Sequence, residues 1–460
     1  MRLQDCTTNS ATLALEILKK NNEKLNNIVT FVEPTIKGEG KLNNVPVVLK
    51  DNVNTKGILT TASCKILDNY VPVYNATIVD KIEKAGGQII AKASMDELAM
   101  GGTNLTALTG PVKNPYDLNR ISGGSSGGSA VAVASGAVPF AIGSDTGDSV
   151  RKPASFNGIV GVKPTYGRIS RYGIIPYSSS LDHVGYFCTN VKDAATLLEV
   201  LAGRDDNDMT SSFEEVKEYS KELNSDIKGK KILVFSNVIE AISNKDVIES
   251  FNNLIEGLKK KGAIVENVSF DEKLMRAILP TYYIIANAEA TANHSNLTGL
   301  LFGERLEGSS IDEIMIKSRS EGFGPWIKKR FVIGSYALKE DNQERVFRKA
   351  QKIRRLIVED VMKKLSDADG LIAPAATGGA PLINSTSTNQ MSDEYLVADN
   401  HMVIGNFTGC PSITLPMGYT EGLPIGVNLT CNPFKEQTMF DISFAIEEIT
   451  GLADKVKEDF

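Results

Sequence analysis

Two serine–glycine loops and one lysine carry the strongest chemical signal in the sequence. The first loop spans residues 123–129 (Gly-Gly-Ser-Ser-Gly-Gly-Ser), and the second spans residues 143–149 (Gly-Ser-Asp-Thr-Gly-Asp-Ser). A serine hydroxyl becomes a good nucleophile only when a base removes its proton. Lys50 ends an apolar run, where partial burial would lower its pKa and make it a base near neutral pH. The pattern indicates acyl transfer through an activated serine.

The elements predicted around these residues bring the loops together. Residues 130–142 are small and apolar, and they predict a short helix, a turn at Gly136 and a buried strand. The run at 45–49 (Val-Pro-Val-Val-Leu) predicts another buried strand, which Lys50 closes. The two loops can therefore converge on one site.

The order Lys50, Ser125, Ser149, with the spacing between the two serines, resembles the amidase signature family. Further blocks resemble one branch of it, the glutaminase subunits of aspartyl/glutamyl-tRNA amidotransferases; they are Lys50-Asp51-Asn52, Thr60–Ser63, Met95–Glu97, Asn114-Pro115 and Val162–Arg168. The resemblance is specific over residues 45–205 and weaker from 280 to the C-terminus. It implies an α/β amidase signature fold, in which helices cover both faces of a central mixed β-sheet.

The resemblance also implies a role for each of the three residues. Ser149 attacks the substrate carbonyl, the hydroxyl of Ser125 takes the proton from Ser149, and neutral Lys50 takes the proton from Ser125. In the family, the peptide bond that enters the middle serine is cis. The loop before the nucleophile can point several backbone N–H groups at one spot, as an oxyanion hole requires. The groups expected there belong to Thr146, Gly147, Asp148 and Ser149.

Asp148 departs from the family motif, which has glycine before the nucleophile. Aspartate tolerates a positive φ less well than glycine, and an inward carboxylate would oppose the negative charge that develops on the substrate. In the harmless orientation, the carboxylate points outward toward Arg151 or Lys152. Arg151 is expected to brace the loop, against Asp145, rather than to contact substrate.

Two further residues are expected to bind substrate. Arg354 resembles the family position that pairs with the carboxylate of glutamine, a task that suits a bidentate guanidinium. The alternative for Arg354 is a solvent-facing cation, because residues 345–355 are rich in bases. Asp399 resembles an acidic position that holds the α-ammonium group of glutamine. Leu297 stands where related glutaminases carry a tyrosine, and it offers no hydroxyl.

Two other kinds of site fit the sequence less well. A Ser-His-Asp hydrolase would need His183, His294 or His401 as its base, and none of them lies in a recognisable base-bearing loop. We interpret His183 as a packed or surface residue. A phosphate-binding loop is disfavoured because Ser129 replaces the lysine of a P-loop, and no G-x-G-x-x-G segment follows a strand.

Composition narrows the class of protein. The 460 residues are 42% apolar and carry a net charge of −6, which predicts a globular protein without a basic surface for gripping nucleic acid. The five cysteines are scattered and include no C-x-x-C pair, which argues against a zinc site and for a reducing compartment. With no apolar leader and no run of membrane-spanning length, we expect a cytoplasmic protein.

The chain is predicted to form one α/β domain over residues 1–460, because no repeat or Pro/Gly-rich linker divides it. The catalytic core is expected at about 45–205, and the remaining sheet, helices and substrate-binding part at about 230–460. A polar surface segment is expected at 204–231. The other predicted elements are helices at 10–25, 76–86, 193–201 and 247–261 and strands at 88–90, 231–235 and 263–265.

The resemblance implies that the chain is the glutaminase subunit of a tRNA-dependent amidotransferase. In the family, a B subunit uses ATP, with Mg, to activate glutamate or aspartate mischarged on tRNA, and a small C subunit wraps the other two. The expected assembly is a heterotrimer in which this chain hydrolyses glutamine, binds no cofactor and meets tRNA only through the B subunit. Two alternatives stay open: a stand-alone amidase of the same fold, and a catalytically silent scaffold subunit, which Asp148 suggests.

Overall fold

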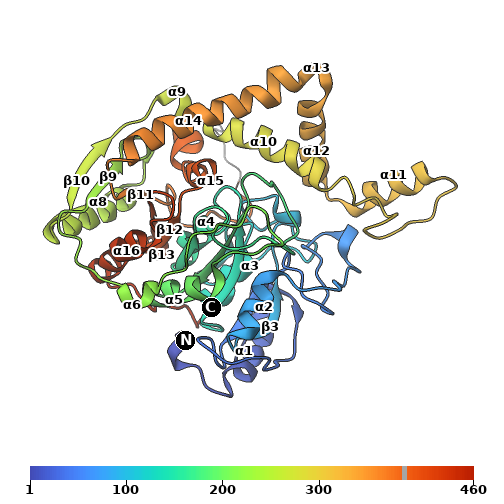
Figure 1. Ribbon diagram of the computed structural model, residues 1–460, viewed down its shortest axis with the longest axis horizontal. Helices are drawn as coiled ribbons and strands as arrows, with labels where there is room; N and C mark the ends of the chain where they lie inside the picture. The colour runs from blue at the N-terminus through green and yellow to red at the C-terminus, as the bar shows by residue number, and fades with distance from the viewer. Residues whose placement is uncertain (386–390) are drawn as a thin grey trace.

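A computed structural model of the chain describes residues 1–385 and 391–460. Within those residues, eleven strands form one sheet through the body of the molecule (Figure 1). In their order across the sheet, the strands are β1 (Ile28–Phe31), β3 (Gln88–Ala93), β2 (Pro46–Lys50), β6 (Phe140–Asp145), β8 (His183–Cys188), β7 (Val160–Lys163), β12 (Ser412–Thr420), β13 (Leu423–Thr430), β11 (Gly370–Pro374), β9 (Lys231–Phe235) and β10 (Ile264–Val268). The N-terminal and C-terminal parts of the chain join where β7 pairs with β12.

The sheet is mixed, as predicted. β2 pairs in parallel with both β3 and β6, whereas β8 pairs antiparallel with β6 and with β7. Parallel neighbours end at the same edge of a sheet. Lys50, the last residue of β2, and Asp145, the last residue of β6, therefore emerge at one edge, and the second glycine-containing loop starts there.

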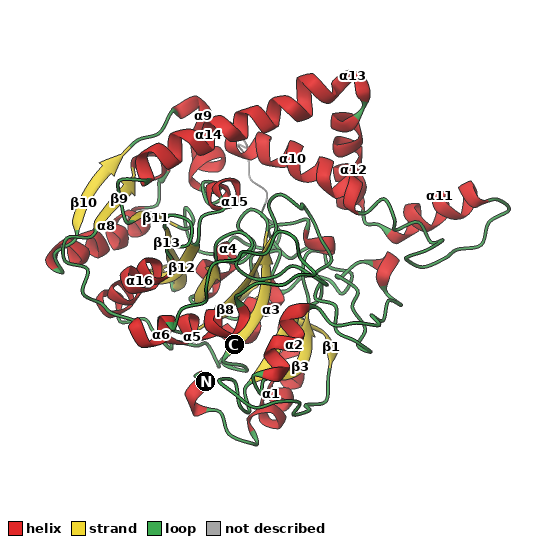
Figure 2. Cartoon of the chain, in the orientation of Figure 1, coloured by secondary structure: helices red, strands yellow, loops and turns green. Residues whose placement is uncertain are grey.

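Helices cover both faces of the sheet, which confirms the predicted architecture (Figure 2). Successive side chains of a strand point to opposite faces. Val47 and Leu49 of β2 belong to one apolar core, and Val48 between them belongs to the other. Helices that contribute to the first core include α2 (Thr77–Lys84), α5 (Val191–Leu201), α8 (Lys245–Lys260) and α16 (Glu436–Thr450). The second core takes residues from α1 (Ser10–Leu25) and α3 (Gly127–Ala134).

The predicted elements around the two loops are confirmed with small shifts at their ends. α3 begins within the predicted first loop, at Gly127, and β6 begins four residues after the turn at Gly136 and includes residues 143–145 of the predicted second loop. The φ angle of Gly136 is +74°, a conformation that glycine adopts at little cost and other residues adopt rarely. Helix α1 covers residues 10–25, as the amphipathic pattern predicts.

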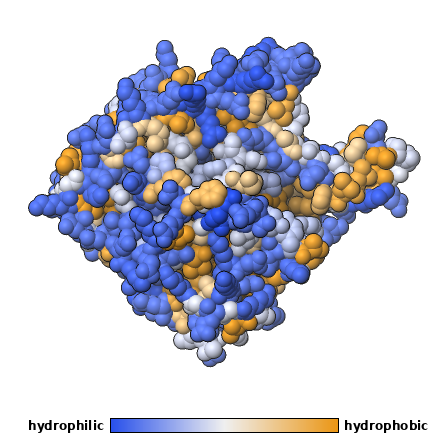
Figure 3. Space-filling view, in the orientation of Figure 1, coloured by the Kyte–Doolittle hydropathy of each residue, from blue (hydrophilic) through white to orange (hydrophobic). Residues whose placement is uncertain are grey.

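A helical segment between β10 and β11 stands outside the sheet. It contains α10 (Ile278–Asn293), α11 (Ile311–Gly322), α12 (Pro325–Leu338) and α14 (Lys349–Leu365). α10 packs against α12 and α14, while α11 projects from the body at the right of Figure 1. Figure 3 shows hydrophobic residues on this projection, where Leu301, Ile311 and Ile316 are exposed. Sequence patterns predicted no individual helix in this segment.

The remaining elements are short. They are α4 (Arg151–Asn157), α6 (Tyr219–Glu222), α7 (Ser236–Ala241), α9 (Glu272–Arg276), α13 (Glu340–Gln343), α15 (Val403–Thr408), one-turn segments at Leu3–Asp5, Lys65–Leu67, Glu97–Ala99, Glu344–Arg348 and Glu394–Ala398, and the hairpin of β4 (Lys113–Asn114) and β5 (Asp117–Ile121). In the described part of the chain, no helix combines the length and the apolar character that crossing a membrane requires.

Candidate active site

Lys50 is fully buried at the end of β2, and its ammonium group is surrounded by serines. The Nζ atom lies 2.7 Å from Ser125 Oγ, 2.9 Å from Ser126 Oγ and 2.9 Å from Ser144 Oγ. An ammonium group has three N–H donors, and three hydroxyl oxygens receive them. When Lys50 is neutral, it keeps two N–H donors and gains one lone pair, which can accept a proton from a hydroxyl.

The surroundings of Lys50 favour its neutral form. Burial lowers the pKa of Lys50 to about 7, against the opposing effect of the carboxylates of Asp96, Asp145 and Asp182. Two other lysines are also fully buried, but Lys92 donates to Val53 O and to a single hydroxyl, Thr60 Oγ1, and Lys163 donates to Cys410 O. Of these three lysines, only Lys50 faces a cluster of serine hydroxyls, and this makes it the candidate base.

Ser125 is held by a tightly packed loop. The peptide bond between Gly124 and Ser125 is cis, as the family resemblance implies. A Cβ atom at position 124 would lie 2.0 Å from Asp96 Oδ2, so only glycine fits there. Asp96 is itself fixed by the backbone N–H of Asn104, at 2.8 Å. The loop therefore places the Ser125 hydroxyl against Lys50 through backbone packing.

The second loop offers a set of free backbone donors. Among the described residues, no protein acceptor takes a hydrogen bond from the backbone N–H groups of Thr146, Gly147, Asp148 or Ser149. Buried backbone N–H groups are rarely left without a partner, so four in succession point to a ligand that completes them. A substrate oxyanion is such a ligand.

Arg151 braces this loop, as predicted. Its Nη2 donates to Asp145 Oδ1 at 2.9 Å and to the Gly147 carbonyl at 2.8 Å, and both charged groups are fully buried. Burial alone would raise the pKa of Asp145, but the Arg151 guanidinium outweighs it and holds that pKa well below its usual range. Loop and helix α4 are thus tied together directly beside Ser149.

Asp148 adopts a backbone conformation without positive φ, so the predicted conformational cost of replacing glycine does not arise. Its carboxylate lies 3.5 Å from Lys152 Nζ, one of the two partners expected for an outward orientation. Burial raises the pKa of Asp148, and Lys152 opposes that rise. The side chain nevertheless lines the cavity described next.

A cavity of about 320 Å³ lies in front of the Gly147–Asp148 segment. α10 contributes Tyr282 and Tyr283 to its wall, and α12 contributes Arg330. The cavity also takes residues from three loops; these include Thr103, Thr377 and Asp399. A Cβ atom at position 147 would meet the Tyr282 ring at about 3.1 Å, so the loop backbone packs directly on that ring.

The structure separates the two predicted substrate contacts. Asp399 lies in the cavity, where its Oδ1 accepts a hydrogen bond from Thr377 Oγ1 at 3.0 Å. Arg354 lies outside the cavity lining, and its guanidinium donates to the Phe407 carbonyl at 3.1 Å and to Ser180 Oγ at 2.9 Å. Leu297 is buried elsewhere, so its lack of a hydroxyl does not affect the cavity.

Arg330 is the cation that sequence analysis missed. Its Nη1 donates to Tyr177 Oη at 3.0 Å, and within the described residues it forms no ion pair. The segment Lys328-Lys329-Arg330 resembles a solvent-facing basic run, so the sequence does not indicate that Arg330 lines the cavity. The helical period offers a signal: Ile327 and Gly334, three residues before and four residues after Arg330, are buried.

A profile of the amidase family matches residues 7–440. The chain belongs to the amidase family. Its curated relatives in the family include the A subunit of the glutamyl-tRNA(Gln) amidotransferase of Lactobacillus delbrueckii subsp. bulgaricus, which is 42% identical over 94% of this chain and 90% of that protein. The corresponding A subunit from Fusobacterium nucleatum is 41% identical over 87% of this chain and 81% of its own length.

Solved structures of the family agree with this assignment. The crystal structure of the A subunit of the Thermotoga maritima glutamyl-tRNA(Gln) amidotransferase is 34% identical and superposes with a TM-score of 0.83, covering 97% of this chain and 94% of that one. The peptide amidase of Stenotrophomonas maltophilia superposes with a TM-score of 0.82 at 26% identity, covering 98% and 96%. The same fold therefore includes both a component of an amidotransferase and a peptide amidase.

Proposed function

We propose that this chain hydrolyses the side-chain amide of glutamine, as the A subunit of a tRNA-dependent amidotransferase. The carrying observation is the contact of a buried, readily neutralised Lys50 with Ser125, beside a loop that ends in Ser149 and offers unpaired N–H groups. The similarity of most of the chain to A subunits of glutamyl-tRNA(Gln) amidotransferases supports the choice of glutamine chemistry.

In the acylation step, the Ser149 Oγ attacks the amide carbon. Its proton passes to Ser125 Oγ, while the Ser125 proton passes to the lone pair of neutral Lys50. The loop N–H groups stabilise the negative oxygen. Lys50 then returns the proton through Ser125 to the departing nitrogen, and ammonia leaves. In structures without substrate, catalytic hydrogen bonds are often long and shorten when substrate binds, so the Ser149–Ser125 step is expected to tighten with glutamine present.

In the second step, water attacks the glutamyl ester of Ser149. Lys50, neutral again, accepts a proton of that water through Ser125 and returns it to Ser149 Oγ. The product forms as the carboxylic acid, and because its pKa is lower than that of Lys50, its proton passes back through the serines to neutral Lys50 as glutamate is released. The same groups therefore serve both halves of the reaction, as general acid–base catalysis requires.

The charges of the cavity suit the two ends of free glutamine. Arg330 can pair with the α-carboxylate, because a guanidinium binds a carboxylate through two parallel hydrogen bonds. Asp399 can accept from the α-ammonium group, which keeps the predicted role of that residue. Arg330 thus takes the role that sequence analysis assigned to Arg354, whose guanidinium is engaged by Ser180 and Phe407.

Arg330→Gln is expected to raise the KM for glutamine by roughly 10–100-fold, because hydrogen bonds to charged groups contribute about 1.5–3 kcal/mol. Its matched control is Arg354→Gln, for which KM should change less than about threefold while the melting temperature falls. Steady-state kinetics of both variants provide the measurement. A larger KM effect from Arg354 than from Arg330 would restore the original assignment.

We further propose that the chain acts in a heterotrimer with B and C subunits in the cytoplasm. Its relatives are named as the A subunits of an amidotransferase, which supports a protein that assembles with other subunits. ATP and Mg would bind to the B subunit, which would also hold the mischarged tRNA.

The test is a comparison of glutamine hydrolysis by the isolated chain and by the chain co-expressed with B and C subunits. Hydrolysis should rise when the partners, ATP and Glu-tRNA(Gln) or Asp-tRNA(Asn) are present, and amidated tRNA should form. If the isolated chain hydrolyses simple amides fully and ignores the partners, it is a stand-alone amidase. If no condition yields glutamine hydrolysis, the chain is a scaffold subunit.

A further inference from the structure

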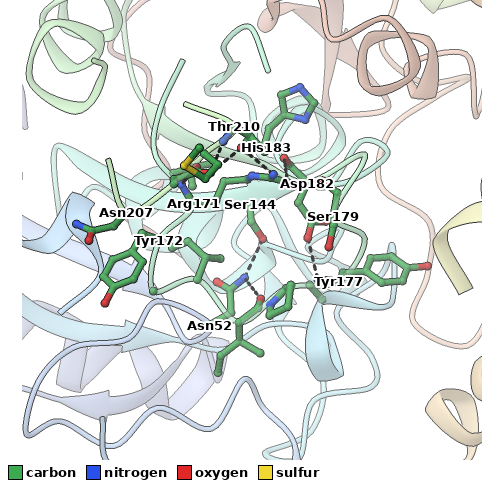
Figure 4. Close-up of a pocket in the computed structure, with 18 residues that line it drawn as sticks. Asn52, Ser144, Arg171, Tyr172, Tyr177, Ser179, Asp182, His183, Asn207 and Thr210 are labelled. Atoms are coloured by element: carbon green, nitrogen blue, oxygen red, sulfur yellow. Dashed lines mark hydrogen bonds between the residues drawn. The ribbon is translucent and has the colours of Figure 1, made fainter. Parts of the chain in front are cut away.

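A second cavity lies behind the catalytic lysine. It has a volume of about 390 Å³ and reaches from exposed residues at the surface, among them Tyr172 and Met209, to the buried side chains of Asn52 and Ser144 (Figure 4). The substrate cavity has a separate lining and shares none of these residues. Lys50 contacts both Ser125, which lines neither cavity, and Ser144, which lines the second cavity.

Ser144 is the only one of the three serines around Lys50 that lines this rear cavity. Its Oγ accepts from Lys50 Nζ at 2.9 Å and from Asn52 Nδ2 at 3.1 Å, as Figure 4 shows for Asn52. Both lone pairs of the oxygen are then used, and its own hydroxyl proton remains free to donate. Asn52 Oδ1 is buried beside it and has no protein partner among the described residues. The Ser144 hydroxyl therefore keeps one donor for solvent in the cavity that it lines.

Ser126 offers an internal comparison. Its Oγ also accepts from Lys50, at 2.9 Å, but its hydroxyl proton is donated to the Ser144 carbonyl at 3.0 Å. Ser126 does not line the rear cavity. The two serines thus make the same contact with Lys50, but Ser126 Oγ also accepts the Ser144 N–H at 3.2 Å and does not reach the rear cavity.

The proposed reaction creates a need for this connection. Hydrolysis of the amide gives RCONH₂ + H₂O → RCOO⁻ + NH₃ + H⁺ when ammonia leaves uncharged, as it must to act as a nucleophile elsewhere. One proton is therefore left behind in each turnover. If that proton stays on Lys50, the base is unavailable for the next cycle. The front of the site is occupied by substrate or product at that time.

We propose that Ser144 passes the surplus proton of Lys50 to solvent in the rear cavity, a step that rests on the glutaminase function proposed above. The N–H bond of the Lys50 ammonium breaks as Ser144 Oγ takes that proton. The hydroxyl proton of Ser144 passes in turn to water, so Ser144 ends unchanged and Lys50 ends neutral. Ser144 acts through Lys50 and is a positioning residue, without contact to substrate.

The charges around the route are compatible with proton release. The carboxylates of Asp96, Asp182 and Asp145, the last residue of β6, act on Lys50. In the rear cavity, Asp182 accepts from Thr146 Oγ1 and from two backbone N–H groups, and Arg171 donates to the Ser179 carbonyl and to Tyr166 Oη. His183 is buried, and its pKa is lowered well below its usual value by burial first and by Lys163 next. His183 therefore remains neutral, and Ser144 is the group that links Lys50 to the cavity.

The experiment compares Ser144→Ala with Ser126→Ala in the assembled enzyme. Each variant removes one hydroxyl acceptor from Lys50. A difference between their rates therefore tests whether the hydroxyl that lines the rear cavity has an additional role. In weakly buffered solution, Ser144→Ala should lower kcat for glutamine about tenfold or more, since positioned proton transfer contributes roughly 10²–10⁴-fold to enzyme rates. Added imidazole, a small proton carrier, should restore most of that loss. Ser144→Thr should keep the wild-type rate, and Ser126→Ala should not respond to imidazole.

A single-event reaction separates proton release from nucleophile activation. A sulfonyl fluoride labels Ser149 once, losing fluoride and leaving one proton on Lys50, so it needs no regenerated base. Ser144→Ala and Ser126→Ala should label at equal rates. A loss of kcat in Ser144→Ala that imidazole leaves unchanged, or an equal loss in both variants, would overturn the relay.

An ester substrate tests the role of Ser144 independently of whether the enzyme hydrolyses glutamine. Hydrolysis of a p-nitrophenyl ester also leaves protons at the site in each turnover. If wild-type enzyme hydrolyses the ester but not glutamine, the proposed function fails, and the same comparison of variants with the ester still decides the role of Ser144.

Discussion

Ser149→Ala is expected to abolish glutamine hydrolysis while the fold and the assembly with partners persist. Its hydroxyl lies at the end of the loop whose four N–H groups have no protein acceptor in the described part of the chain, so no neighbouring serine can replace it. Loss of an activated nucleophile costs roughly 10⁴-fold or more in kcat. Ammonia release measured on the purified variant, together with its thermal unfolding curve, tests this result.

Ser129→Ala is the matched control for the nucleophile. Ser129 is also a buried serine of the glycine-rich loops, but its hydroxyl donates to the Ile142 carbonyl at 2.8 Å. Removing this bond should cost about 1 kcal/mol of stability and leave kcat within a few-fold of wild type. Near-normal hydrolysis by Ser149→Ala would refute the mechanism, whatever the control shows.

Lys50→Met is expected to be almost as inactive as Ser149→Ala. Methionine fills similar space, but it offers no lone pair of comparable basicity to Ser125. Because the two residues act as one unit, the double variant should be little worse than either single variant. Additive losses would mean that Lys50 only supports the structure.

The pH profile gives an independent test of the same base. Lys50 must be neutral to accept a proton, and its pKa is lowered by burial to about 7. The value of kcat/KM in the wild type should therefore fall as the pH is lowered through about 7, and rise to a plateau above it. Lys163→Met serves as the control, because Lys163 is equally buried but donates to a backbone carbonyl. Its acid limb should match that of the wild type.

The sequence could predict the parts of the site that lie in short, contiguous segments. The strand before Lys50 is a continuous apolar run, and the small residues between the two loops allow only a tight helix–turn–strand connection. The brace between Arg151 and Asp145 follows from their closeness in the chain. Local patterns of this kind fix both the element and the position of the side chain.

The substrate cavity could not be predicted in the same way. Tyr282 and Arg330 come from two helices that approach the loops only through the packing of α10 against α12. Nothing local distinguishes Arg330 from the lysines before it, or Arg354 from the bases around it. The environments of the two arginines differ because Arg330 lines the cavity, whereas Arg354 donates to the Phe407 carbonyl. Such long-range placement depends on the whole fold.

The division between these two groups of residues has a consequence for how the protein can change over generations. The reacting groups belong to strands and loops within residues 50–149, whereas much of the cavity wall comes from residues 279–399. A substitution in the later segment can alter which amide fits without disturbing the proton path. Substitutions at the part of the cavity wall formed by residues 279–399 can therefore change the substrate range while the residues that carry out the reaction stay constant.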